Sequence, residues 1–132
     1  MFNKVGHLGI AVKDIDQAVA AFSKVLGLPR PEIRDVPEKK MKVALLDLHG
    51  LALEFLEDYS EEGPIGKFVA ERGNGIHHFC LETDHIEDEI EELVSRGAEM
   101  RDYQPRMGLR GKKIAFVHPD SLDGLVVELT EP

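Results

Sequence analysis

The sequence contains one pattern twice, and this repeat limits the possible folds more than any other feature. His78 follows His7 by 71 residues, and each histidine is followed by an acidic residue and then by apolar residues at helical spacing. Self-similarity at a fixed offset indicates a repeated structural unit. Each half, at roughly 60 residues, would be marginally stable alone. We therefore predict one domain, residues 1–132, in which module one (1–57) and module two (76–132) pack together and 58–75 connect them.

Each module is expected to fold in the order β-α-β-β-β, because alternating apolar residues predict strands and apolar residues three to four apart predict helices. Gly27 and Gly97 are expected to end the two module helices. In module one we expect strands at 4–12, 32–36, 42–48 and 51–57, a helix at 15–26 and a turn at His49-Gly50. A further helix is expected at 65–72. In module two we expect strands at 76–83, 99–103, 112–118 and 124–130, a helix at 85–96 and a turn at 119–123.

Composition excludes several classes of function. The net charge of −9 argues against nucleic acid, whose binding requires a basic surface. No apolar run approaches the roughly 20 residues needed to span a bilayer, and the N-terminus lacks a signal-peptide pattern. Cys80 is the only cysteine, so no internal disulfide forms, as expected in a reducing compartment. We expect a cytoplasmic protein with no membrane partner.

Strand periodicity brings four polar residues to one face of the predicted sheet. In each strand the apolar residues share one side, suited to packing under helices, and the other side carries His7, Glu54, His78 or Glu128. These residues form two repeat-equivalent pairs, one of histidines and one of glutamates. The predicted fold class is thus α+β, with a curved mixed sheet and a cleft on its polar face.

Two imidazoles and two carboxylates form a suitable ligand set for a divalent transition metal, with two positions left for water or substrate. A lone strand histidine is more often structural, but four residues paired by repeat favour a site. His77 falls on the opposite face and is interpreted as structural. Cys80 falls on the cleft face and is interpreted as a small buried residue.

Several longer segments resemble a known family. The chain is similar to the vicinal oxygen chelate (VOC, or glyoxalase-fold) superfamily and, within it, to the methylmalonyl-CoA epimerases. The resemblance covers essentially the whole chain and rests on His7-Leu8-Gly9-Ile10-Ala11-Val12-Lys13-Asp14, Glu54-Phe55-Leu56-Glu57, Pro64-Ile65-Gly66-Lys67-Phe68, Gly75-Ile76-His77-His78, Pro105-Arg106-Met107-Gly108, Ile114-Ala115-Phe116-Val117-His118-Pro119 and Gly124-Leu125-Val126-Val127-Glu128-Leu129.

The resemblance implies an isomerase of propionate metabolism that interconverts (R)- and (S)-methylmalonyl-CoA. It implies a divalent metal, Co²⁺ first and Zn²⁺, Ni²⁺ or Mn²⁺ as alternatives, held by His7, Glu54, His78 and Glu128. The metal would stabilise the enolate that forms when the α-proton is removed. Glu128 is the candidate for one catalytic base. Val43 stands where some epimerases carry an acidic residue, so the second base would be Glu54, a water molecule or a group that the sequence does not identify.

Substrate recognition is expected to involve basic residues near the cleft. Arg110 lies in a loop that reads Gly-Leu-Arg-Gly where the epimerases usually have small residues, and it is a candidate for the substrate carboxylate. Lys112 and Lys113 are candidates for the coenzyme A phosphates. Pairing of exposed edge strands favours a homodimer.

Two other functions remain open at this point. A glyoxalase I-like lyase (lactoylglutathione lyase), or another VOC metalloenzyme, would use the same metal ligands. A VOC protein that sequesters a ligand without chemistry usually lacks the ligand set. Metal content distinguishes the binding protein from the enzymes, and substrate choice distinguishes the enzymes from each other.

Overall fold

The computed structural model describes residues 1–60 and 62–132. The chain divides into two compact units: unit 1 comprises Met1–His7 and His78–Pro132, and unit 2 comprises Leu8–His77. Strands β1 (Phe2–Ala11) and β5 (Gly75–Thr83) each contribute residues to both units. The module boundaries at 57 and 76 stay a prediction, and Glu61 of the connecting segment lies outside the described residues.

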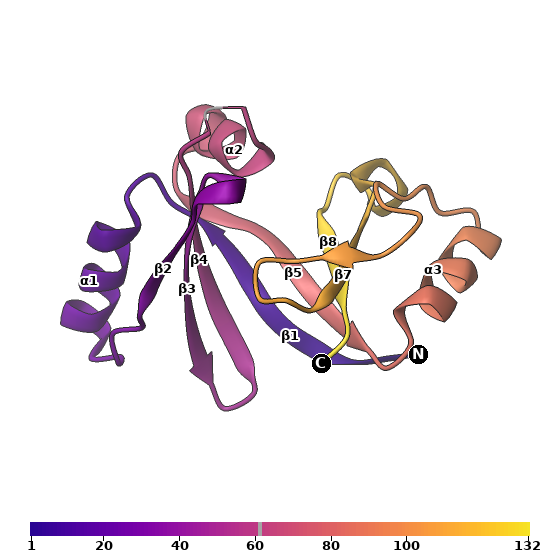
Figure 1. Cartoon of the computed structure of the whole chain (residues 1–132), viewed down its shortest axis with the longest axis horizontal. Helices are drawn as coiled ribbons and strands as arrows, with labels where there is room; N and C mark the ends of the chain where they lie inside the picture. Colours follow the sequence, from indigo (N-terminus) through magenta and orange to yellow (C-terminus); the bar gives the residue numbers. More distant parts are fainter. Residues whose placement is uncertain (61) are drawn as a thin grey trace. The chain divides into compact units, whose positions relative to one another are not determined.

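Unit 2 combines a layer of strands in the order β2-β3-β4-β1 with helix α1 (Figure 1). The elements of unit 2 besides β1 and β5 are α1 (Ile15–Leu26), β2 (Ile33–Val36), the 3₁₀ turn η1 (Pro37–Lys39), β3 (Met41–Leu48), β4 (Leu51–Asp58) and α2 (Pro64–Arg72). β3 and β4 pair antiparallel, with Leu48 opposite Leu51. His49 and Gly50 both have positive φ (56° and 99°), as a two-residue hairpin turn requires. The predicted hairpin and edge strand are confirmed.

Alternation along the strands builds the core of unit 2. Phe55 is fully buried and packs with Val12, Ile15, Val19 and Ala44. Since Phe55 faces this core, its neighbour Glu54 lies on the opposite side of β4. The α1 helix begins at the N-cap Asp14, whose side chain accepts a hydrogen bond from the Gln17 N–H, and ends at Gly27 in the left-handed conformation. Both limits were predicted.

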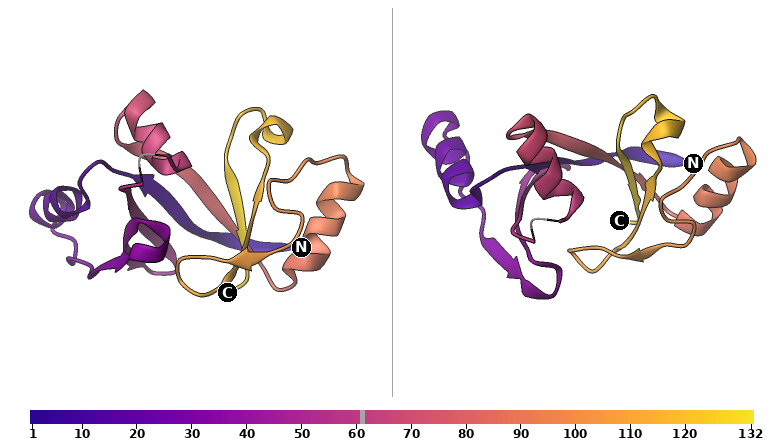
Figure 2. Two further views of the ribbon diagram at one scale, coloured as in Figure 1. Left: turned by 45° about the horizontal axis from the view of Figure 1, so that its top comes forward. Right: turned by 90° about the horizontal axis from the view of Figure 1, so that it is seen from above.

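Unit 1 contains a strand layer in the order β1-β5-β8-β7-β6 with α3 packed against β7 (Figure 2). The elements of unit 1 besides β1 and β5 are α3 (Ile86–Ser95), β6 (Arg106–Met107), β7 (Lys113–Val117), the 3₁₀ turn η2 (Pro119–Leu122) and β8 (Val127–Thr130). β5 and β8 pair parallel, whereas β7 pairs antiparallel with both β6 and β8. The sheet is therefore mixed, and the predicted α+β class is confirmed.

The core of unit 1 lies between α3 and one face of the strands. Ile86 and Ile90 of α3 pack on Ala115, Val127 and Leu129. Phe79 of β5 packs against the same cluster, so its neighbours His78 and Cys80 take the other face. The helices of the described residues are amphipathic and short, and none is long and apolar enough to cross a membrane.

Module two differs from the prediction at its second and fourth strands. The segment 99–103 is not a strand: only Met100 forms an isolated bridge, with Val117. The ladder cannot extend because the Phe116 N–H donates to the Asp102 side chain (2.9 Å) instead of to a backbone carbonyl. The strand at this place in the order is instead β6, which lies between the expected strands 99–103 and 112–118. β8 begins at Val127 instead of 124, after Gly124 with φ of 91°.

Candidate metal centre

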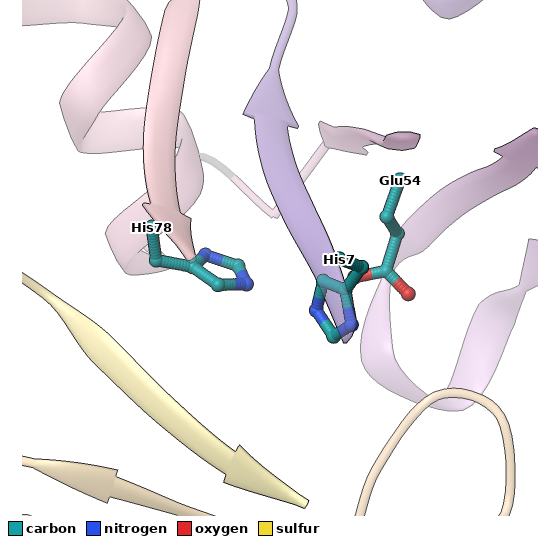
Figure 3. Close-up of side chains that lie close together, drawn as sticks. All are labelled: His7, Glu54 and His78. Atoms are coloured by element: carbon teal, nitrogen blue, oxygen red, sulfur yellow. The ribbon is translucent and has the colours of Figure 1, made fainter. Parts of the chain in front are cut away.

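Two histidines meet on neighbouring strands of unit 1. His7 lies on β1 and His78 on β5, and their exposed fractions are 2% and 4%. The two imidazoles project from these strands and meet edge to face, with ring centroids 5.6 Å apart (Figure 3). The Phe116 ring of β7 contacts His78 from another side, with centroids 5.5 Å apart. Both imidazoles are therefore held in a nearly dry environment.

A carboxylate from β8 lies against both rings. Glu128 Oε1 is 2.9 Å from His7 Nε2 and 4.0 Å from His78 Nε2. All three atoms are buried. Two imidazole nitrogens and one carboxylate oxygen therefore lie close together in the protein interior. That arrangement suits ligands of one cation.

Electrostatics at Glu128 favour the carboxylate form. Burial by itself raises the pKa of this carboxyl, because it penalises the charged form. The neighbouring imidazoles of His7 and His78 lower it, and the Cys80 thiol adds to their effect. The net result is a pKa below the usual value, so Glu128 carries the negative charge that a metal ligand needs.

Cys80 belongs to the same cluster. It is fully buried, and its register partner across the β5–β8 pair is Glu128. The ligand atoms of His7, Cys80 and Glu128 all lie within 4.8 Å of one another. The sequence pattern placed Cys80 on this face but favoured a packing role. Its position two residues after His78 was the sequence signal that could have placed Cys80 in the cluster.

Arg110 also reaches this cluster. It lies at the tip of the β6–β7 hairpin, and its Nη2 is 2.9 Å from His7 Nδ1. Of the other predicted substrate residues, Lys113 forms an ion pair with Glu87 of α3 (2.8 Å), and Lys112 is exposed. Lys113 shares its face of β7 with the core residue Ala115, whereas Phe116, on the other face, contacts His78.

Unit 2 carries the fourth predicted ligand. Glu54, also labelled in Figure 3, extends from β4 and is 5% exposed, which is unusual for a carboxylate. Its register partner on β3 is Leu45. Val43, on the same strand, is 2% exposed and pairs with Leu56. His77, interpreted as structural, makes an edge contact with the Phe68 ring.

The donor atoms fit a divalent metal. Imidazole nitrogens and carboxylate oxygens are common ligands of zinc, cobalt, nickel and manganese, and the proportion of the two differs from metal to metal. Unit 1 brings two such nitrogens and one such oxygen to a single buried position, with a sulfur beside them. A cation there would compensate the buried charge of Glu128, whose isolation would otherwise be costly.

Comparisons with known proteins identify a family to which the chain is similar. A family model of the Glyoxalase/Bleomycin resistance protein/Dioxygenase superfamily matches residues 6–116. The Bacillus subtilis protein YqjC, which is uncharacterized, is 34% identical, with 98% of this chain and 93% of that protein covered. The ethylmalonyl-CoA/methylmalonyl-CoA epimerase of Cereibacter sphaeroides is 31% identical, with 99% of both chains covered.

Among solved structures, a variant of Streptomyces coelicolor methylmalonyl-CoA epimerase in complex with 2-nitronate-propionyl-CoA has a TM-score of 0.90. It is 26% identical and covers 99% of this chain and 95% of that one. The family match spans most of the chain, and these three proteins match it over nearly their whole length. The chain therefore belongs to the glyoxalase/bleomycin resistance protein/dioxygenase superfamily and adopts the VOC fold.

Proposed function

We propose that this protein is a metal-dependent epimerase that interconverts (R)- and (S)-methylmalonyl-CoA. The observation that carries the proposal is the buried cluster of His7, His78 and Glu128 in a chain whose relatives include methylmalonyl-CoA epimerases. A related structure holds an acyl-CoA analogue, which supports an acyl-CoA as the substrate class. Ethylmalonyl-CoA is a second substrate to test, since the Cereibacter enzyme is named for both.

The metal would be held by His7, His78, Glu128 and Glu54. The first three are supported by their mutual distances within unit 1. Glu54 is assigned by its burial and by its correspondence to Glu128 in the repeat. We propose Co²⁺ as the ion. When bound, the metal supplies a Lewis acid for the thioester oxygen, where negative charge develops.

The protein's own carboxylates would move the proton. Epimerisation breaks the α-carbon–hydrogen bond on one face and forms it again on the other, so it needs a proton acceptor and a proton donor on opposite faces. The electron pair left at the α-carbon is delocalised into the thioester carbonyl and returns when the carbon is reprotonated. We assign these roles to Glu128 and Glu54, since Val43 has no ionisable group.

Basic residues of the β6–β7 hairpin would hold the anionic parts of the substrate. The Arg110 guanidinium can take the malonyl carboxylate in a bidentate pair. Lys112 and Lys113 would provide positive charge for the coenzyme A phosphates in an otherwise acidic chain. Exchanging both lysines for methionine is expected to raise KM for the acyl-CoA and leave kcat nearly unchanged.

The test is exchange of the α-proton of methylmalonyl-CoA in deuterated water, followed by NMR. Cobalt-loaded wild type is compared with metal-stripped protein, with Glu128→Gln and with the matched control Glu91→Gln, which removes an exposed carboxylate from α3. We expect exchange in the loaded wild type and in the control. We expect a loss of at least about a hundredfold in the stripped protein and in Glu128→Gln.

A lack of exchange in the metal-loaded wild type would refute the epimerase assignment. A glyoxalase I-like lyase is the remaining enzyme class with this ligand set. The same loaded samples are therefore also given the hemithioacetal of methylglyoxal and glutathione. Turnover of that compound without α-proton exchange would establish the lyase instead.

A further inference from the structure

The contact between Arg110 and His7 restricts the proton arrangement of the imidazole. A guanidinium carries only N–H donors, so His7 Nδ1 must accept at their separation of 2.9 Å. In a neutral imidazole the proton then lies on Nε2. That nitrogen is 2.9 Å from Glu128 Oε1. The contact with Arg110 therefore puts the His7 proton on the nitrogen that faces the other candidate ligands.

Metal coordination requires the opposite arrangement. A metal at the cluster takes the lone pair of His7 Nε2, because Nε2 is the ring nitrogen beside Glu128. The other ring nitrogen of a metal-bound histidine then carries a proton and needs an acceptor. Nδ1–H and the guanidinium would face each other as two donors, and the cationic guanidinium would also lie near a dication. Arg110 must leave His7 when the metal binds.

We propose that Arg110 exchanges partners, binding His7 Nδ1 in the metal-free protein and the carboxylate of the acyl substrate in the metal-loaded protein. The proposal rests on the proposed function for the identity of the second partner. It assigns Arg110 two linked effects: it opposes metal binding in the absence of substrate, and it selects acyl groups that carry a free carboxylate.

The hairpin is built to allow this movement. Its base is fixed by the register of Arg106 with Ile114, and by the Arg106 side chain over the Phe116 ring. A Cβ on Gly108 would lie 2.9 Å from the Ile114 side chain, so this position also packs tightly. The tip is a short turn, closed by the hydrogen bond from Gly111 N–H to Gly108 O (3.1 Å), and Arg110 lies inside it. A side-chain rotation at the tip can release His7 and leave the base in place.

Substrate selection follows from the same exchange. Once turned from His7, a planar guanidinium is suited to a carboxylate through two parallel hydrogen bonds. A malonyl-type thioester offers that group and a propionyl thioester does not. Because binding free energies are coupled in both directions, a ligand that draws Arg110 away must also tighten metal binding.

The experiment measures Zn²⁺ affinity by calorimetry on metal-stripped protein, alone and with saturating malonyl-CoA or propionyl-CoA. These two ligands share coenzyme A and differ in the carboxylate. The variants are Arg110→Met and the matched control Arg101→Met, which removes an exposed arginine of the same unit. We expect Arg110→Met to bind Zn²⁺ roughly tenfold more tightly than wild type, within the usual range of coupling between sites. The control should match wild type.

In wild type, malonyl-CoA should tighten Zn²⁺ binding more than propionyl-CoA does, and the difference should vanish in Arg110→Met. NMR of the ring nitrogens of His7 gives a second readout, with the proton on Nε2 in the stripped protein and on Nδ1 after Zn²⁺ is added. Zn²⁺ affinity of Arg110→Met equal to that of the control, or a proton on Nδ1 before metal is added, would overturn the proposal. Exchange of the substrate α-proton by the wild type is measured separately, so the epimerase assignment can survive that result.

Discussion

Two glutamates cap helices from a distance, and their contributions to stability can be compared within one chain. Glu57 Oε1 accepts a hydrogen bond from the N–H of Ile15, the first residue of α1 (2.9 Å). Glu131 Oε2 accepts one from the N–H of Ile86, the first residue of α3 (3.0 Å). Glu57 and Glu131 follow Glu54 and Glu128 at the same spacing, so the caps belong to the repeat.

The two helices depend on these caps to different degrees. At α1 the Asp14 side chain also accepts from Gln17, so removal of Glu57 leaves one side-chain cap. At α3 the N-cap residue His85 makes no side-chain cap bond, and Glu131 is the distant acceptor for the first amide. Loss of a charged acceptor costs about 1–2 kcal/mol when the donor is partly buried, and an alternative cap reduces that cost. We expect Glu131→Ala to cost about 2 kcal/mol and Glu57→Ala about 1 kcal/mol.

The assay is urea unfolding followed by far-UV circular dichroism at neutral pH. Glu131→Gln is included because it keeps an acceptor oxygen and loses only the charge, so it should recover roughly half of the loss. Native-state hydrogen exchange should show faster exchange at the α3 amides in Glu131→Ala and at the α1 amides in Glu57→Ala. Equal free energies of unfolding for wild type and Glu131→Ala would refute the capping argument.

Two further perturbations test a partly buried carboxylate and a buried thiol. Hydrogen bonds from Ser60 and from the Gly66 N–H of α2 outweigh the burial that raises the pKa of Asp58, and hold it below its usual value. A carboxyl group whose pKa is lower in the folded than in the unfolded state stabilises the protein above the unfolded pKa of about 3.9. That stabilisation is lost as the pH falls through the folded pKa. Solvent screening limits this contribution, because Asp58 is only partly buried. Asp58→Asn should therefore cost at most about 1 kcal/mol at neutral pH and progressively less below about pH 4 in urea titrations. A pH-independent difference would contradict this. Cys80 is fully buried, so a thiol reagent should label it at least roughly a hundredfold more slowly in native than in urea-unfolded protein, and equal rates would contradict its burial.

Most of the fold was predictable because its elements carry local signals. The α1 helix has both an N-cap aspartate and a C-terminal glycine, and the β3–β4 hairpin has a turn of two residues with positive φ. β6 could not be predicted in the same way. Its two residues carry no alternation, and its position follows from pairing with β7, while Asp102 blocks the segment that has the stronger strand pattern.

The face of each candidate ligand was also predictable, because a period of two fixes which side of a strand a residue occupies. His78 and Glu128 lie on the other face of their strands from their neighbours Phe79 and Leu129. Both of these apolar residues pack in the core of unit 1, as expected. Periodicity gives no distance along neighbouring strands, so it could not predict that Cys80 lies beside Glu128. That neighbour relation comes from the parallel register of β5 and β8.

The position of Arg110 shows what a departure from a family pattern can mean physically. Where the family resemblance led us to expect small residues, this chain has a long cation inside a short turn, and the turn brings it to a histidine of the candidate metal centre. A buried imidazole can satisfy an arginine or a metal at opposite nitrogens, but the two partners require the proton on different atoms. On the partner-exchange proposal, Arg110 would leave the candidate ligand set intact and change the free energy of metal binding. The proposal would then let one set of candidate ligands respond to the substrate through a residue that is not itself a ligand.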